Sequence, residues 1–129
     1  MVTLSNNAAS GFVKALGNMA HGVVVSQVFP FERSLASPLV KEMRDMLTAR
    51  RKGEEATPAM LEGFAAAKVL VEALKRAGKD PTPERIKTAL EGFKHVDIGG
   101  LEVTFSPTDH TGLDYSDLSI ITADGKFRR

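Results

Sequence analysis

The 129-residue sequence contains no cysteine and no tryptophan, and aromatic residues make up only 6% of it. The absence of cysteine excludes disulfide bonds, thiolate metal sites and thiol catalysis. No apolar run approaches the roughly 18 residues that a membrane-spanning helix needs. The N-terminus lacks the basic and then apolar pattern of a secretion signal. The sequence alone therefore indicates no targeting signal. The absence of cysteine suits a cytosolic or a periplasmic location equally well.

An excess of charge of one sign is also missing. Seventeen basic and sixteen acidic side chains leave a formal net charge of +1. A nucleic-acid surface needs clustered lysine and arginine, but the densest cluster, Arg50-Arg51-Lys52, is followed at once by Glu54 and Glu55. We therefore expect a solvated helix end there and no nucleic-acid partner. The length and the 43% of hydrophobic residues suit one globular domain.

Three segments have the pattern of a helix start, a hydroxyl side chain followed by proline: Ser37-Pro38, Thr57-Pro58 and Thr82-Pro83. The hydroxyl can cap the helix, and proline suits the first helical position. Apolar residues at three- and four-residue spacing then predict helices over 38–50, 57–77 and 83–92, and another over 7–19. Helix 57–77 is apolar around most of its circumference, which predicts burial on more than one side.

The strands are expected to be short. Segment 22–29, GVVVSQVF, is almost continuously apolar, which predicts a strand buried on both faces of a parallel sheet. Further strands are expected over 99–105, 117–122 and 126–129, with a hairpin turn at Asp124-Gly125. The order of elements predicts an α/β or α+β fold. The strands recognised are too few to cover segment 22–29, so we expect its edges to be incompletely covered.

Five segments occur in an order typical of one protein family: AHGVVVSQVFP (20–30), PLVKEMRDML (38–47), MLEGFAAAKVLVEALKRAGKDPTPERIKTALEGF (60–93), DIGGLEVTFSPTDHTG (97–112) and DLSIITADGKF (117–127). Together they resemble the C-terminal third of the periplasmic solute-binding proteins of ABC transporters. The closest group is the leucine/isoleucine/valine type of extracellular ligand-binding receptor. The resemblance implies an α/β fold, namely part of a type I periplasmic-binding-protein fold.

The resemblance also implies two lobes joined by chain crossings, with the whole chain forming one partial solute-binding domain. Residues of about 30–100 would contribute helices to the first lobe, and about 1–25 and 105–129 would belong to the second. Crossings are expected at Ser26–Phe31 and around Gly100–Phe105. The hinge residues implied in this way are Gln27, Pro30, Phe31 and Gly100.

By the same resemblance, the lobes would close around an amino acid or a related small carboxylate and present it to an ABC permease in the membrane, which implies a periplasmic location. The family's main ligand anchors lie in parts that this chain does not match. In the matched region, Ala59, Met60 and Glu62 are expected near the cleft. For Glu62 the alternative interpretation is the favoured one, namely an acid stabilised near a helix N-terminus by the helix dipole.

Asp109 and His110 are the one adjacent acid and histidine in the sequence, within FSPTDHTG. Pro107 and Gly112 favour a turn here, and Asp109 can accept hydrogen bonds from downstream amides. Zinc would need further ligands at defined spacing, and a hydrolase would need a nucleophile motif such as G-x-S-x-G, which is absent. We therefore expect a turn, with no catalytic residue, metal or cofactor.

Two functions remain open for the chain. The first is a non-catalytic part of a solute-binding receptor. The second is a free-standing module that associates with itself, because uncovered apolar surfaces drive association. The faces of helix 57–77 and the edges of strand 22–29 are the surfaces expected to be uncovered. A homodimer or a higher oligomer is therefore expected.

Overall fold

The computed structural model describes residues 1–4 and 10–128, which form a mixed α/β structure, as predicted. Residues 7–9 of the first expected helix and residue 129 of the last expected strand lie outside the described residues. In chain order the elements are β1 (Val2–Leu4), α1 (Ser10–Leu16), the 3-10 helix η2 (Gly17–Ala20), β2 (Val24–Gln27), α2 (Pro38–Arg50), α3 (Pro58–Ala77), α4 (Pro83–Glu91), β3 (Val96–Asp97), β4 (Glu102–Ser106), β5 (Asp109–Gly112), β6 (Asp117–Ile121) and β7 (Phe127–Arg128).

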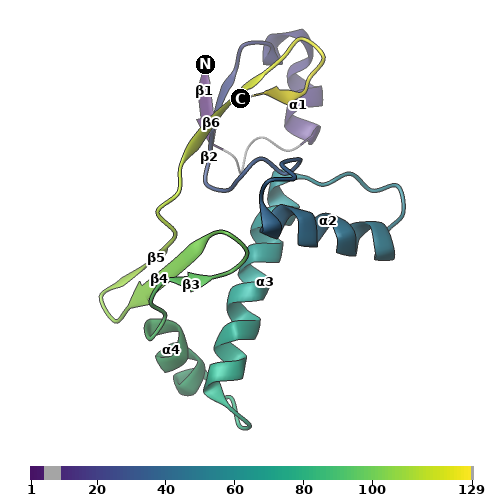
Figure 1. Cartoon of the computed structure of the whole chain (residues 1–129). Coiled ribbons are helices and arrows are strands. Elements are labelled where there is room, and N and C mark those ends of the chain that lie inside the picture. Colours follow the sequence, from purple (N-terminus) through teal and green to yellow (C-terminus); the bar gives the residue numbers. More distant parts are fainter. Residues whose placement is uncertain (5–9, 129) are drawn as a thin grey trace.

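The elements form two groups at opposite ends of an elongated molecule (Figure 1). The sheet group is a four-stranded sheet in the order β1-β2-β6-β7, together with α1 and η2. The helix group contains α2, α3, α4 and a three-stranded sheet in the order β3-β4-β5. Each group has its own hydrophobic core, so the chain is built from two packed units joined by short passages.

β2 has hydrogen-bonded neighbours on both sides, so the expectation of uncovered edges is wrong. β1 runs parallel to it, with Val2 opposite Val24, and β6 runs antiparallel, with Ile120 opposite Val24. The sheet is therefore mixed and not parallel as predicted. β1 is not predictable from the sequence, because three residues carry too little periodicity to identify a strand.

One face of this sheet is covered and the other is open. On the covered face, Val23, Val25 and Ile121 form a buried core with residues of α1 and η2. Because side chains alternate along each strand, the register places the next residues on the opposite face, which we call the open sheet face: Val2, Leu4, Val24, Leu118 and Ile120. The prediction that strand 22–29 is buried on both faces is thus wrong for this chain.

α3 is also buried along one stripe only. Leu61, Ala65 and Ala73 lie in the core of the helix group, whereas Leu70 and Val71 remain 49% and 50% exposed. The predicted burial on more than one side is therefore not found. Over residues 1–4 and 10–128, no helix combines the length and the apolar character needed to cross a bilayer.

All three predicted helix starts are confirmed, but only two have the predicted side-chain cap. Thr57 Oγ1 accepts a hydrogen bond from the Met60 N–H at 3.2 Å, and Thr82 Oγ1 accepts one from the Arg85 N–H at 3.3 Å. Ser37 makes no side-chain cap hydrogen bond. At the start of α2 the Leu39 N–H donates to the Gly99 carbonyl oxygen at 2.9 Å. A turn from elsewhere in the chain therefore supplies an acceptor for an N–H group that a helix leaves unpaired.

The FSPTDHTG segment forms a hairpin and not a turn alone. Pro107 and Thr108 make the turn, and Asp109 and His110 begin β5. The Asp109 N–H donates to Ser106 Oγ at 3.0 Å, which closes the hairpin. The expectation that Asp109 and His110 lie in a turn is therefore wrong, because both belong to β5. The turn-forming residues around them do not indicate a strand.

Candidate functional site

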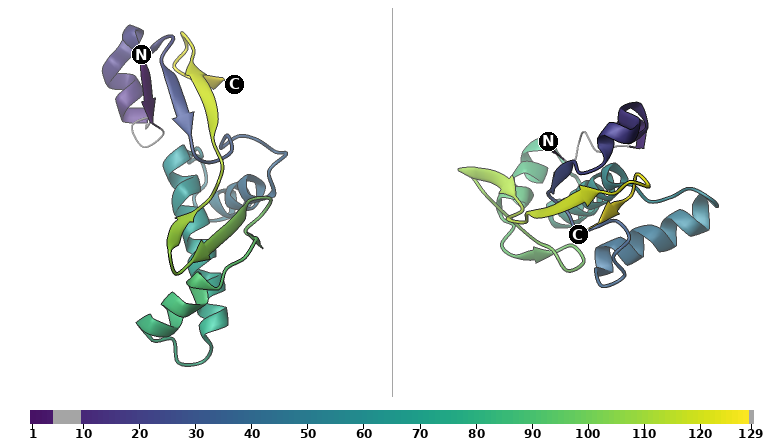
Figure 2. Two further views of the ribbon diagram at one scale, coloured as in Figure 1. Left: turned by 90° about the vertical axis from the view of Figure 1, so that its left-hand side faces the viewer. Right: turned by 90° about the horizontal axis from the view of Figure 1, so that it is seen from above.

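The chain passes between the two groups twice, over residues 28–37 and 113–116, which we call the passage region. The strands that lead into these passages are neighbours, because β2 ends at Gln27, β6 begins at Asp117, and these two residues are paired across the sheet. The passages therefore leave the sheet group side by side, as the views in Figure 2 also show. Two adjacent connections between separate cores can act as a hinge.

The first passage includes much of the expected crossing Ser26–Phe31, but the second lies further along the chain than expected. Gly100 sits in the turn between β3 and β4, where its N–H donates to Asp97 Oδ1 at 2.6 Å. Phe105 packs on Phe93, with ring centroids 6.0 Å apart, and Val103 is buried in the same core. The structure thus keeps Gly100 and residues 105–112 in the helix group, because Val103 and Phe105 of β4 pack in its core and β5 pairs with β4.

A buried polar pair holds β2 and β6 together at the point where they enter the passages. Gln27 and Ser119 are 7% and 5% exposed, and Gln27 Nε2 donates to Ser119 Oγ at 3.0 Å. Next to them, Tyr115 Oη donates to Asp117 Oδ2 at 3.4 Å, while the tyrosine packs against the core of the helix group. Of the expected hinge residues, Gln27 therefore lies at the junction of both passages.

The first passage also contains a buried carboxylate that the sequence pattern does not predict. Glu32 is only 5% exposed, next to the half-buried Pro30 and Phe31. Burial raises the pKa of Glu32, and this effect is opposed by a hydrogen bond from its own backbone N–H and by the charge of Arg33. The Arg33 Nε lies 3.9 Å from the Glu32 carboxylate. An acid beside an arginine in a proline-containing loop ordinarily faces water, so the burial of Glu32 is not predictable from the residues around it.

The N-terminal end of α3 lies beside the first passage (Figures 1 and 2). Ala59 is exposed there and Glu62 is half-buried. Met60 is also half-buried, and it lines a shallow hollow of about 420 Å³ together with residues of α2 such as Met43. The three residues expected near the cleft are therefore on one helix end, but the side chain of Met60 serves the contact with α2.

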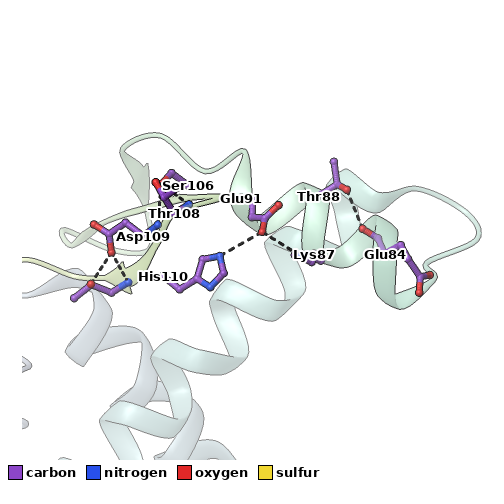
Figure 3. Close-up of polar contacts among 9 residues, drawn as sticks. Glu84, Lys87, Thr88, Glu91, Ser106, Thr108, Asp109 and His110 are labelled. Carbon is purple, nitrogen blue, oxygen red and sulfur yellow. Dashed lines mark hydrogen bonds and ion pairs between the residues drawn. The ribbon is translucent and has the colours of Figure 1, made fainter.

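The side chains of Asp109 and His110 bond to different partners and not to each other. The Asp109 carboxylate accepts hydrogen bonds from the side-chain hydroxyl of Thr111 at 2.6 Å and from its N–H at 2.9 Å, and these bonds lower the pKa of Asp109. His110 Nε2 lies 3.3 Å from Glu91 Oε1 on α4 (Figure 3). Because the acid and the histidine have different partners, they form no catalytic dyad. Within residues 1–4 and 10–128, no group of three or more metal-ligating side chains comes together.

Several known proteins resemble the chain. A family model described as periplasmic binding protein matches residues 1–126. A possible leucine/isoleucine/valine-binding protein from Rhodopirellula baltica is 29% identical, with a TM-score of 0.87 over 99% of this chain and 35% of that chain. An extracellular ligand-binding receptor from Verminephrobacter eiseniae is 27% identical, with a TM-score of 0.83 over 99% of this chain and 37% of that chain.

A branched chain amino acid ABC transporter from Thermus thermophilus with bound valine has the same fold, at 19% identity and a TM-score of 0.76 over 98% of this chain and 37% of that chain. Among curated proteins, none matches the chain significantly. The chain spans 35% to 37% of the length of these solved structures. The chain therefore belongs to the periplasmic binding protein family and has part of its type I fold.

Proposed function

We propose that the chain provides part of a non-catalytic receptor that binds an amino acid or a related small carboxylate in the periplasm and delivers it to an ABC permease. Branched-chain amino acids are the first ligand class to test, because they are named for the Rhodopirellula baltica and Thermus thermophilus proteins that the chain resembles. Lobe closure, and not bond chemistry, would be the working step.

The pairing of Gln27 with Asp117 is the observation that carries this proposal. It brings both passages to one place, so a small rotation there moves the sheet group relative to the helix group without breaking either core. Hinges of this kind absorb the motion in a few residues at the ends of elements. In the proposed receptor Gln27, Pro30 and Phe31 form the hinge.

The ligand would lie between the groups, beside the passage region. Ala59 and Glu62 at the start of α3 would border this space, with Ala59 offering a small apolar surface and Glu62 a carboxylate for the ammonium group of an amino acid. Met60 would contribute by holding the helix end against α2. The remaining ligand contacts would come from receptor parts that the relatives have and this chain does not match.

A chimera tests the proposal. Residues 1–129 replace the matching segment of the Rhodopirellula baltica protein, and calorimetry measures binding of leucine, isoleucine, valine, glutamate and phenylacetate. We expect the chimera to bind a branched-chain amino acid, and the 129-residue chain alone to bind none of the probes tightly. In the chimera, Glu62→Gln should weaken amino-acid binding, whereas Glu84→Gln on α4 should leave it unchanged.

Two results would contradict the proposal. A chimera that folds cooperatively as a single species but binds none of the amino acids would remove the assigned ligand class. Tight binding by the 129-residue chain alone would show that its own residues suffice, and the ligand would then not need contacts from elsewhere.

Self-association is a second candidate function, which the uncovered surfaces favour. One side of α3 carries only small or apolar exposed residues along its first four turns, and we call this side the open helix face: Ala59, Gly63, Ala66, Ala67, Leu70 and Val71. Together with the open sheet face it gives the chain two apolar surfaces, and such surfaces typically mark contacts between proteins. Sedimentation should show a homodimer or a larger oligomer at micromolar concentration. A compact monomer would exclude this function.

A further inference from the structure

A hollow of about 600 Å³ lies between α4 and the β4–β5 hairpin. Ile86 and Leu90 of α4 and Phe105 of β4 form its apolar wall, and Lys87, Glu91 and His110 surround it. We call it the α4 hollow. α4 lies at the end of the helix group that points away from the sheet group (Figure 1), and none of the residues that line the hollow belongs to the passage region.

The aromatic wall of this hollow is held in place on two sides. The ring of Phe105 packs on Phe93, with centroids 6.0 Å apart. It also lies directly against Gly112 on β5, where a Cβ atom would come within 2.6 Å of Phe105 Cε1. A ring fixed in this way loses little conformational freedom when a ligand packs on it, which favours binding.

The charged groups around the hollow are paired with each other. Glu91 Oε1 lies 3.3 Å from His110 Nε2 and 3.6 Å from Lys87 Nζ (Figure 3). When the imidazole is neutral, the charges of Lys87 and Glu91 cancel. The carboxylate then requires the hydrogen on Nε2, so Nδ1 of His110 is an acceptor. With the imidazole neutral, the α4 hollow combines an apolar wall and no net charge with acceptors for a ligand hydroxyl, on Nδ1 of His110 and on the Glu91 carboxylate.

We propose that the α4 hollow binds a small uncharged aromatic molecule with one hydroxyl group, such as a phenol. The ring packs against Phe105 and Leu90, and the hydroxyl donates to His110. A volume of this size falls within the range of ligand pockets in proteins, about 300–1,000 Å³. The site is distinct from the proposed amino-acid site, and its occupancy does not depend on the rest of a receptor.

A titration followed by two-dimensional NMR of the 129-residue protein tests this proposal, with p-cresol as the probe. We expect saturable shifts confined to residues 83–91 and 105–112, with a dissociation constant on the order of 1 mM, given the few atoms of the probe. p-Xylene, which has a methyl group in place of the hydroxyl, should bind a few-fold more weakly. Shifts that do not saturate, or that spread over the open sheet face, would overturn the proposal.

His110→Ala and His95→Ala form a matched pair of variants. Both histidines are exposed, with 61% and 77% of the side chain accessible, and each contacts a glutamate, but only His110 borders the hollow. His110→Ala should weaken p-cresol binding about 2–12-fold, the usual effect of one lost hydrogen bond. Equal affinities of the two variants, or tighter binding of 4-methylbenzylamine or 4-methylphenylacetate than of p-cresol, would overturn the assignment.

Discussion

The carbonyl oxygen of Gly99 accepts a hydrogen bond from the backbone N–H of Leu39, with a distance of 2.9 Å between nitrogen and oxygen. Leu39 is fully buried in the core of the helix group, so this bond fixes the turn between β3 and β4 against the start of α2. Gly99 has a φ angle of +117°, and a Cβ atom on it would lie 2.9 Å from the Leu39 nitrogen. Glycine is required here both by the backbone conformation and by the close contact.

Replacing this glycine by alanine should therefore be costly. We expect Gly99→Ala to lower the free energy of unfolding by about 2 kcal/mol or more, because strain and a backbone clash act together. Gly63→Ala in α3 is the control, since a Cβ there meets no atom within 4 Å. That variant should gain about 0.5–1 kcal/mol from reduced backbone entropy. Urea denaturation measures both, and equal stabilities would contradict the role assigned to Gly99.

Glu32 should make stability depend on pH in a particular direction. Burial raises the folded-state pKa above the ordinary glutamate value of 4.5, so the folded protein holds this proton more tightly than the unfolded chain does. The resulting stabilisation is fully present below pH 4.5 and is lost as the pH rises through the folded-state pKa. At pH 7 the buried charge therefore opposes folding.

Glu32→Gln should accordingly raise the free energy of unfolding at pH 7, and this gain should shrink as the pH falls toward 4. Chemical denaturation across this pH range measures the difference from the unmodified protein. Glu102→Gln, at a glutamate whose side chain is 66% exposed, should stay within about 0.5 kcal/mol at every pH. A gain at position 32 that does not vary with pH would show that burial of the charge is not its cause.

The helices were predictable because their signals are local. Proline after a hydroxyl residue set the start of α2 and α3, and Gly78 follows directly after the last residue of α3. The short strands were not predictable in the same way. β3 has only two residues, Val96 and Asp97, and it exists because Val103 and Glu102 of β4 pair with it. A strand of this kind depends on its partner, and the sequence of the strand alone does not show it.

The candidate site was only partly predictable for the same reason. Gln27 is the last residue of β2, directly before a loop that contains proline, and its role in a hinge stays a prediction. The burial of Glu32 depends on the tertiary contacts of the first passage. Such contacts leave no pattern in the sequence. The second passage lies at 113–116 and not around Gly100–Phe105, because Phe105 packs on Phe93 in the core of the helix group.

The helix caps allow a further test of local signals. Thr57→Ala removes the acceptor for the Met60 N–H and should cost about 1 kcal/mol, the usual value for a helix N-cap. Ser37→Ala should cost less than about 0.5 kcal/mol, because the Ser37 side chain makes no cap hydrogen bond. Thermal unfolding of both variants measures the difference. An equal loss at the two positions would mean that capping by Thr57 Oγ1 is not the source of the effect.

The open helix face gives the last prediction. Leu70 is 49% exposed and lies among alanines and Val71. A self-associated form would bury it at little conformational cost. A charged side chain at this position would have to lose its hydration on association, which costs free energy. Leu70→Glu should therefore weaken association at least tenfold, as measured by sedimentation equilibrium. Leu35→Glu is the matched control, because Leu35 is 71% exposed in the first passage and lies outside both open faces. If both variants weaken association equally, general hydrophobicity drives it; if only Leu70→Glu does, α3 is the contact surface.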